Sequence, residues 1–146
     1  MGAAGVQLTE IELDTLTGRI RVTESYTGVG VGKIVSPVTA LSQVQGGVIQ
    51  GIGFTLYEER HLDPRTGRLL SASMDSYRIT GIGDIPMLNV HFDETPFEGV
   101  VGGSVGLAEL STIPVAASIA NAIYHATGWR PFRTPIRMDH WLGRPR

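Results

Sequence analysis

The stretch from Ser36 to Glu59 combines the apolar spacing of a helix with an unusual number of glycines. Ser36 followed by Pro37 predicts the helix start, because serine caps helix N-termini and proline suits the first turn. Apolar residues then recur at three- and four-residue steps as far as Glu59. Each internal glycine costs ~1 kcal/mol relative to alanine, so a helix that keeps several is predicted to pack very close to a neighbour. The predicted helix, residues 37–59, contains Gly46, Gly47, Gly51 and Gly53.

The composition is that of a folded protein. Of 146 residues, 42% are apolar and 18% charged, so the chain can bury a core and is not disordered. A net charge of −2 gives no field that attracts nucleic acid or an anionic membrane. The absence of cysteine excludes disulfides, thiolate zinc sites and iron–sulfur clusters held by this chain. No apolar run reaches the ~18 residues of a membrane span and no secretory signal is evident, so we expect a cytoplasmic protein, periplasmic only if exported with a partner subunit.

A β-hairpin is predicted before the glycine-rich helix. Residues 6–13 and 19–27 alternate apolar and polar side chains, and residues 14–18 carry the Asp and Gly of a tight turn. The alternation of the second strand runs through Ile20, Val22 and Tyr26, which predicts these three side chains on one face. Regular structure is expected to break at the glycines that follow, Gly28, Gly30 and Gly32.

The second half of the chain predicts short strands and a last helix. A turn is expected at residues 63–67, a strand at 87–92 and a glycine-rich loop at 98–106. The last helix is expected to begin near Thr112 or Ile113 and end at Gly128, and to be buried because it is small and apolar on most sides. The predicted fold class is α+β: a single domain with an N-terminal β-hairpin, a glycine-rich long helix, short strands and a buried C-terminal helix.

Glu109 is the candidate acid–base residue. It ends the sequence GLAE, after a glycine-rich loop and before a helix whose N-terminus favours an ionised carboxylate. Glycines let a ligand approach the backbone closely, so Glu109 could act there as a general base. The alternative is a surface glutamate that only complements the helix dipole, and spacing alone leaves both open.

The last seventeen residues form an arginine tail with a single acidic residue, Asp139. It is either solvated or docks on an acidic partner surface. Its arginines are Arg130, Arg133, Arg137, Arg144 and Arg146.

Three segments together carry a family resemblance. They are QVQGGVIQGIG over residues 43–53, GLAE over 106–109 and NAIYHATG over 121–128. In this order they resemble the C-terminal part of the molybdenum-binding subunit of the xanthine dehydrogenase / aldehyde oxidase family, the molybdenum hydroxylases.

The resemblance implies a chemistry and two site residues. It implies hydroxylation of an aldehyde or N-heterocycle at an electron-poor sp² carbon, with water as the oxygen source and a molybdenum–molybdopterin cofactor. Glu109 matches the catalytic base, and Gln43 matches a glutamine that hydrogen-bonds the pterin. The four helix glycines match small residues that permit close packing. No residue of this chain is implied as a metal ligand.

The family's molybdenum subunit is several times longer than this chain. The resemblance therefore implies that residues 1–146 are a C-terminal molybdopterin-binding domain, a fragment or a split subunit, that shares the cofactor with a missing upstream domain. Expected partners are the remainder of that subunit, iron–sulfur subunits and, as a further candidate, an FAD subunit. The isolated chain is expected to lack the cofactor, to be inactive and to self-associate through exposed apolar surface. The alternative function is a non-catalytic assembly module that binds a partner through the glycine-rich helix and the arginine tail.

Overall fold

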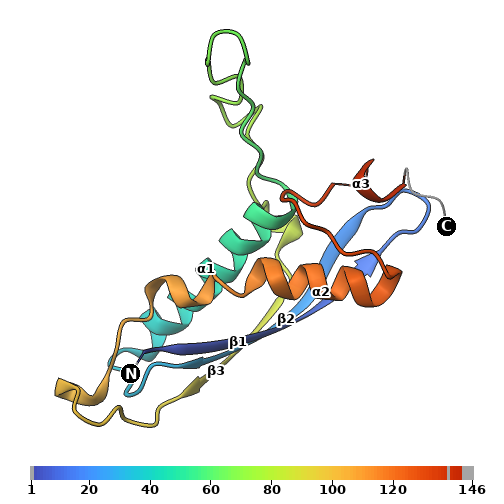
Figure 1. Ribbon diagram of the computed structural model, residues 1–146. Helices are drawn as coiled ribbons and strands as arrows, with labels where there is room; N and C mark the ends of the chain where they lie inside the picture. The colour runs from blue at the N-terminus through green and yellow to red at the C-terminus, as the bar shows by residue number, and fades with distance from the viewer. Residues whose placement is uncertain (1, 138, 143–146) are drawn as a thin grey trace.

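The computed structural model describes residues 2–137 and 139–142 (Figure 1). Arg144 and Arg146 of the arginine tail lie outside the described residues. Short 3₁₀ turns lie at η1 (Ile82–Asp84), η2 (Val101–Gly103) and η3 (Ala108–Ser111). The strands and α-helices, in chain order, are β1 (Ala4–Leu13), β2 (Ile20–Gly30), α1 (Pro37–Leu56), β3 (Met87–Asp93), α2 (Val115–Thr127) and α3 (Asp139–Leu142).

The three strands form one sheet in the order β1-β2-β3. β1 and β2 pair antiparallel through the predicted turn, in which the Asp14 carboxylate accepts hydrogen bonds from the backbone N–H groups of Leu16 and Thr17. Gly18 closes this turn with a φ of 71°. β3 pairs parallel to β2, and α1 lies in the connection between them. The prediction of an α+β fold with an N-terminal hairpin is confirmed.

A bulge in β2 changes which side chains face the core. Glu10 pairs with Glu24 and Ile11 with Val22, so Thr23 is an extra residue in β2. The inward positions are even-numbered before the bulge, as at Val22 (3% exposed), and odd-numbered after it. Tyr26 is therefore 46% exposed, and the prediction that it shares a face with Ile20 and Val22 is wrong. The buried residues after the bulge are Ser25, Thr27 and Val29.

Two of the three glycines expected to break β2 lie within it. Gly28 and Gly30 pair with both neighbouring strands, so that prediction is wrong for them. A Cβ added at Gly28 would lie 3.0 Å from Val6 Cγ1 on the open face of the sheet, so a residue larger than glycine would crowd Val6 here. Gly32, with a φ of 74°, does lie beyond the strand's end.

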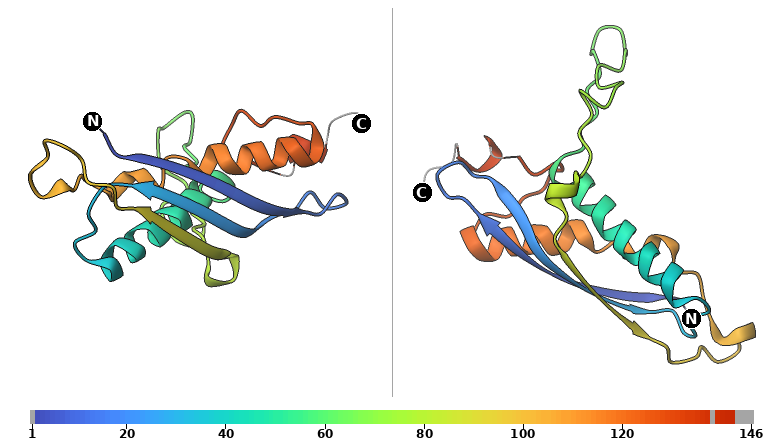
Figure 2. Two further views of the ribbon diagram at one scale, coloured as in Figure 1. Left: turned by 90° about the horizontal axis from the view of Figure 1, so that it is seen from below. Right: turned by 180° about the vertical axis from the view of Figure 1, so that it is seen from behind.

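Both long helices cover the same face of the sheet and leave the other face open (Figure 2). α2 buries a single stripe, because Asn121, Tyr124 and His125 on its other side are exposed, so the expectation that it is buried on most sides is wrong. The Ser118 hydroxyl on α2 donates a 2.6 Å hydrogen bond to Thr9 Oγ1 of β1. The helix residues at the centre of the core are Val44, Val48, Ile52, Val115, Ile119 and Ile123.

The ends of α1 differ from the prediction in two details. The helix ends at Leu56 rather than Glu59, because the backbone N–H groups of Tyr57 and Glu58 both donate to the Gly53 carbonyl. Ser36 occupies the N-cap position, but its side chain makes no capping hydrogen bond. The prediction of a serine cap is therefore wrong, while proline in the first turn is confirmed.

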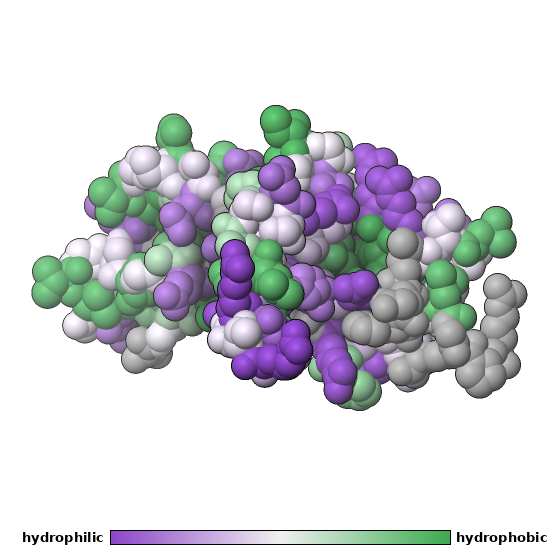
Figure 3. All heavy atoms as spheres, turned by 90° about the horizontal axis from the view of Figure 1, so that it is seen from above, coloured by the Kyte–Doolittle hydropathy of each residue, from purple (hydrophilic) through white to green (hydrophobic). Residues whose placement is uncertain are grey.

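Residues 58–80 form an arm that projects from the body of the molecule (Figure 1). The predicted turn at residues 63–67 is confirmed near its tip, where Leu62 and Leu69 form a β-bridge. Apolar side chains are exposed in several separate places on the face from which the arm rises (Figure 3). Over the described residues, neither long helix has the length and hydrophobicity that crossing a bilayer requires. Exposed apolar residues on the arm are Leu62, Leu69, Leu70, Met74 and Ile79.

Candidate functional site

The structure brings the two predicted site residues together. Gln43 lies in the first half of α1, and its side-chain Nε2 donates a 3.2 Å hydrogen bond to the carbonyl oxygen of Ala108 in η3. Ala108 directly precedes Glu109, so the amide of Gln43 is tied to the backbone beside the candidate base. Both side chains are exposed on the surface.

Glycines in α1 make this approach possible. A Cβ added at Gly47 would collide with Ser111 Oγ and lie 3.1 Å from Thr112 Oγ1. A Cβ at Gly51 would lie 2.6 Å from Val115 Cβ, at the start of α2. The predicted close packing is confirmed at these two positions, where only a hydrogen fits between α1 and the segment that carries Glu109.

The other two helix glycines have different surroundings. Gly53 faces the side chains of Glu58 and Thr80 at the foot of the arm. Gly46 has no atom within 4 Å of its added Cβ and is exposed. Close packing at Gly46 is therefore not seen against any described residue, and Gly46 leaves open space beside Gln43.

The glycine-rich loop before Glu109 is anchored to the end of β2. Gly102 and Gly103 have φ values of 79° and 70°, in the left-handed region that favours glycine. The Gly103 carbonyl accepts a 3.2 Å hydrogen bond from the backbone N–H of Lys33, and the Ser104 hydroxyl donates to the Lys33 carbonyl. Ala108 adopts a 3₁₀ conformation without positive φ, so its methyl group adds no backbone strain.

The Glu109 carboxylate makes no hydrogen bond or ion pair with any described residue of the chain. Its own carbonyl accepts from the backbone N–H of Thr112, which fixes the turn that displays the side chain. In the part of the chain that the structure describes, no three His, Cys, Asp or Glu side chains gather into a group that could hold a metal ion. Glu109 and Gln43 remain the candidate residues for contact with a cofactor.

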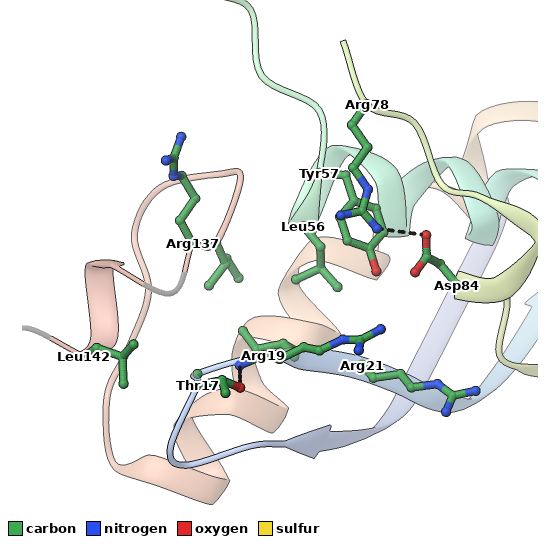
Figure 4. A pocket seen from close by; sticks show the side chains of 12 residues that line it. Thr17, Arg19, Arg21, Leu56, Tyr57, Arg78, Asp84, Arg137 and Leu142 are labelled. Atoms are coloured by element: carbon green, nitrogen blue, oxygen red, sulfur yellow. Dashed lines mark hydrogen bonds and ion pairs between the residues drawn. The ribbon is translucent and has the colours of Figure 1, made fainter. Parts of the chain in front are cut away.

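The structure also contains a cavity of about 640 Å³ at the foot of the arm, which the sequence did not predict (Figure 4). Segments far apart in the chain form it, so no local motif could have indicated it. The Arg78 guanidinium stacks 4.1 Å from the centre of the Tyr57 ring and lies 3.1 Å from Asp84 Oδ2. The residues that line the cavity include Thr17, Arg19, Arg21, Leu56, Tyr57, Arg78, Asp84, Ile136, Arg137 and Leu142.

Two pKa values in this cavity are shifted by their surroundings. Burial, together with the nearby Asp84 carboxylate, raises the pKa of Tyr57. Burial acts to raise the pKa of Asp84, but hydrogen bonds from the Gly81 backbone N–H and from Arg78 outweigh it and hold that pKa below its usual value. Tyr57 therefore stays a neutral phenol and Asp84 stays ionised at neutral pH.

Known proteins that are similar to this chain include molybdenum-binding subunits of oxidoreductases. Residues 2–86 match the family described as molybdopterin cofactor-binding domain. The chain is 36% identical over 135 residues to the aldehyde oxidoreductase molybdenum-binding subunit PaoC of Escherichia coli, covering 91% of the chain and 18% of that protein. It is 33% identical over 141 residues to a probable xanthine dehydrogenase subunit of Bacillus subtilis, covering 97% of the chain and 18% of that protein.

Solved structures agree with the sequence relatives. The aldehyde oxidoreductase of Desulfovibrio desulfuricans superposes with a TM-score of 0.86 at 29% identity, over 96% of this chain and 15% of that one. Quinoline 2-oxidoreductase of Pseudomonas putida 86 superposes with a TM-score of 0.83 at 28% identity, over 90% of this chain and 17% of that one. The chain thus spans less than a fifth of the length of these relatives. With a matching family profile, related molybdenum-binding subunits and a shared fold, this chain belongs to the molybdopterin cofactor-binding domain family.

Proposed function

We propose that this chain works as part of a molybdenum hydroxylase, in which Glu109 is the catalytic base and Gln43 contacts the pterin cofactor. The observation that supports this most directly is the hydrogen bond from Gln43 to Ala108, which places the two side chains at one exposed site. The open space at Gly46 on the same helix leaves room for a ligand beside Gln43.

Each side chain has a defined task in this proposal. A bound molybdenum–molybdopterin cofactor would supply the two-electron oxidation. The Glu109 carboxylate accepts the proton lost by the water-derived oxygen that attacks the substrate carbon. No described residue forms a hydrogen bond or ion pair with this carboxylate, so it is available to accept that proton. Gln43 uses its Nε2 to hold the Ala108 carbonyl, so its Oε1 is available to accept a hydrogen bond from a ligand N–H.

The substrate class follows the relatives' names. PaoC is a subunit of an aldehyde oxidoreductase, and the superposed Pseudomonas enzyme oxidises the N-heterocycle quinoline. We propose an aldehyde or an N-heterocycle, oxidised at an electron-poor sp² carbon. Because the chain spans 18% of PaoC, we propose as its first partner the polypeptide that supplies the rest of the molybdenum subunit. The family resemblance adds an iron–sulfur subunit and an FAD subunit as further proposed partners.

Co-expression tests the proposal. The chain would be produced together with the rest of a molybdenum subunit, supplied as a separate polypeptide, and the complex would be analysed for molybdenum and for aldehyde and N-heterocycle oxidation. The expected result is a complex with stoichiometric molybdenum and turnover, whereas the isolated chain has neither. A complex that forms without molybdenum would favour a non-catalytic assembly module, and stoichiometric molybdenum on the isolated chain would contradict the shared site.

A further inference from the structure

We infer that the arginine-lined cavity at the foot of the arm binds an acidic segment of the polypeptide that completes the subunit. The inference rests on the proposed function, because it takes that polypeptide as the partner. The cavity, of about 640 Å³, lies between the β1–β2 turn, the end of α1 and the side chains of Ile136, Arg137 and Leu142 (Figure 4). None of its lining residues is Gln43 or Glu109, so it is distinct from the proposed cofactor contact.

The cavity carries an excess of positive charge. Arg78 is already paired with Asp84 at 3.1 Å, and Arg137 with Glu59 at 2.6 Å. The guanidinium groups of Arg19 and Arg21, by contrast, have no ion-pair or hydrogen-bond partner among the described residues, and both are exposed. Two unpaired guanidinium groups two residues apart repel each other and attract carboxylates, which they can bind through paired hydrogen bonds.

The floor of the cavity is apolar. Leu56 and Ile136 are buried there, while Leu142 is half exposed at its edge. A ligand that fits both parts combines carboxylates for the arginines with an apolar side chain for the floor. A peptide segment in which an apolar residue is flanked by Asp or Glu has this chemistry.

The surroundings favour a polypeptide over a dissolved anion. Leu16, the chain neighbour of Thr17, is 85% exposed, and Ile79, the neighbour of Arg78, is 48% exposed. A free carboxylate or phosphate would leave these apolar side chains in water, whereas a docked chain would cover them together with the cavity.

Charge reversal at the two unpaired arginines tests the inference. The double variant Arg19→Glu/Arg21→Glu would be compared with the matched control Arg65→Glu/Arg68→Glu, which makes the same charge change near the tip of the arm. Affinity for the purified companion polypeptide would be measured by biosensor titration at low and high salt, after circular dichroism has shown that each variant is folded. The pair Arg19→Gln/Arg21→Gln replaces the first variant if charge reversal prevents folding.

We expect the Arg19/Arg21 variant to bind on the order of tenfold more weakly at low salt, with a smaller difference at high salt, and the control to bind within about twofold of wild type. Equal binding by wild type and the Arg19/Arg21 variant would overturn the inference while leaving the proposed function intact. Equal weakening of both variants would also overturn it, because the cavity would then have no special role. Failure of the wild-type chain to bind the companion would instead reject the proposed function and, with it, this inference.

A titration with inorganic phosphate separates a free anion from a protein segment. We expect no saturable NMR shifts at the Arg19 and Arg21 side chains below millimolar phosphate. Saturation in that range, together with unaltered companion binding, would assign the cavity to a small anion and overturn the inference.

Discussion

The side-chain amide of Gln43 and the carbonyl oxygen of Ala108 are joined by a hydrogen bond of 3.2 Å, although the two residues lie 65 positions apart in the chain. This hydrogen bond connects the exposed side of α1 to the turn that contains Glu109. Gln43 therefore has a role within the chain itself, in addition to its proposed contact with the pterin.

Replacement of Gln43 by alanine should loosen the turn that carries Glu109. Loss of this partly solvated hydrogen bond removes about 0.5–1.5 kcal/mol of stabilisation, most of it local. Hydrogen exchange should become faster at the Leu110 and Thr112 amides, which close the turn on Leu107 and Glu109. Gln50→Ala, an exposed glutamine on the same helix, is the control; if both variants exchange alike, the bond does not order the turn.

Replacement of Glu109 by glutamine should abolish turnover in the assembled enzyme without loss of molybdenum. The amide keeps the shape of the carboxylate but cannot accept a proton, and removal of a general base typically costs ~10²–10⁴-fold in rate. Glu98→Gln, an exposed glutamate in the preceding glycine-rich loop, should leave turnover within about twofold. Near-normal turnover of the Glu109 variant at full molybdenum content would show that Glu109 only complements the helix dipole.

The helix glycines offer a pair of opposite stability predictions. Gly51→Ala should destabilise the fold by ~1–3 kcal/mol, because its methyl group would press on Val115. Gly46→Ala should stabilise it by ~0.5–1 kcal/mol, because this exposed helix position has open space and alanine is the better helix former. Urea unfolding of both variants measures the difference, and the same sign for both would contradict the packing described.

Acid should weaken the β1–β2 turn. The pKa of Asp14 lies below the ordinary value of 3.8, because the Thr17 hydroxyl and the backbone N–H groups of Leu16 and Thr17 donate hydrogen bonds to its carboxylate. A group with a lowered folded pKa stabilises the fold above its unfolded pKa, and this contribution disappears as the pH falls through the folded pKa. Protection of the Gly18 amide should therefore be constant down to about pH 4 and decline below it.

Asp14→Asn removes this pH dependence if the assignment is correct. Asp75→Asn, on the arm, serves as the control that leaves the turn unchanged. An NMR titration that placed the pKa of Asp14 at or above 3.8 would contradict the hydrogen bonding described.

Self-association of the isolated chain remains a prediction, with α1 as the expected contact. The described surface has apolar residues on the free side of α1, such as Val38 and Phe54, and on the open face of the sheet, such as Leu8. Val38→Asp should reduce association in sedimentation velocity more than Leu8→Asp does, because the charge lies on the expected contact. The reverse order would assign the contact to the sheet, and a monomeric wild-type chain that binds no apolar dye would reject the prediction.

Most elements of the fold could be predicted because they depend on local chemistry. The Asp–Gly turns, proline in the first turn of α1 and the glycine that ends α2 at Gly128 follow from the backbone preferences of single residues. The bulge at Thr23 could not be predicted, since it depends on pairing with β1, and it reversed the expected direction of Tyr26. Gly28 was misjudged for the same reason, because its cross-strand neighbour Val6 is distant in sequence.

The sequence pointed to candidate site residues but not to their geometry. The family resemblance indicated Gln43 and Glu109, and the glycines indicated close packing, but nothing local showed that Gly47 and Gly51 face the segment between Ser111 and Val115. The arginine-lined cavity gave no sequence signal, because its walls come from the hairpin, the end of α1, the arm and the segment before α3.

The hydrogen bond between Ser118 and Thr9 spans 109 positions, which has a consequence for how the chain folds. β1 is made before α2, yet α2 covers its inner face. The inner face of β1 therefore stays uncovered from the time β1 is made until α2 has left the ribosome. Contacts this distant in sequence also slow refolding, because the entropy of closing a long loop must be lost before the contact stabilises anything.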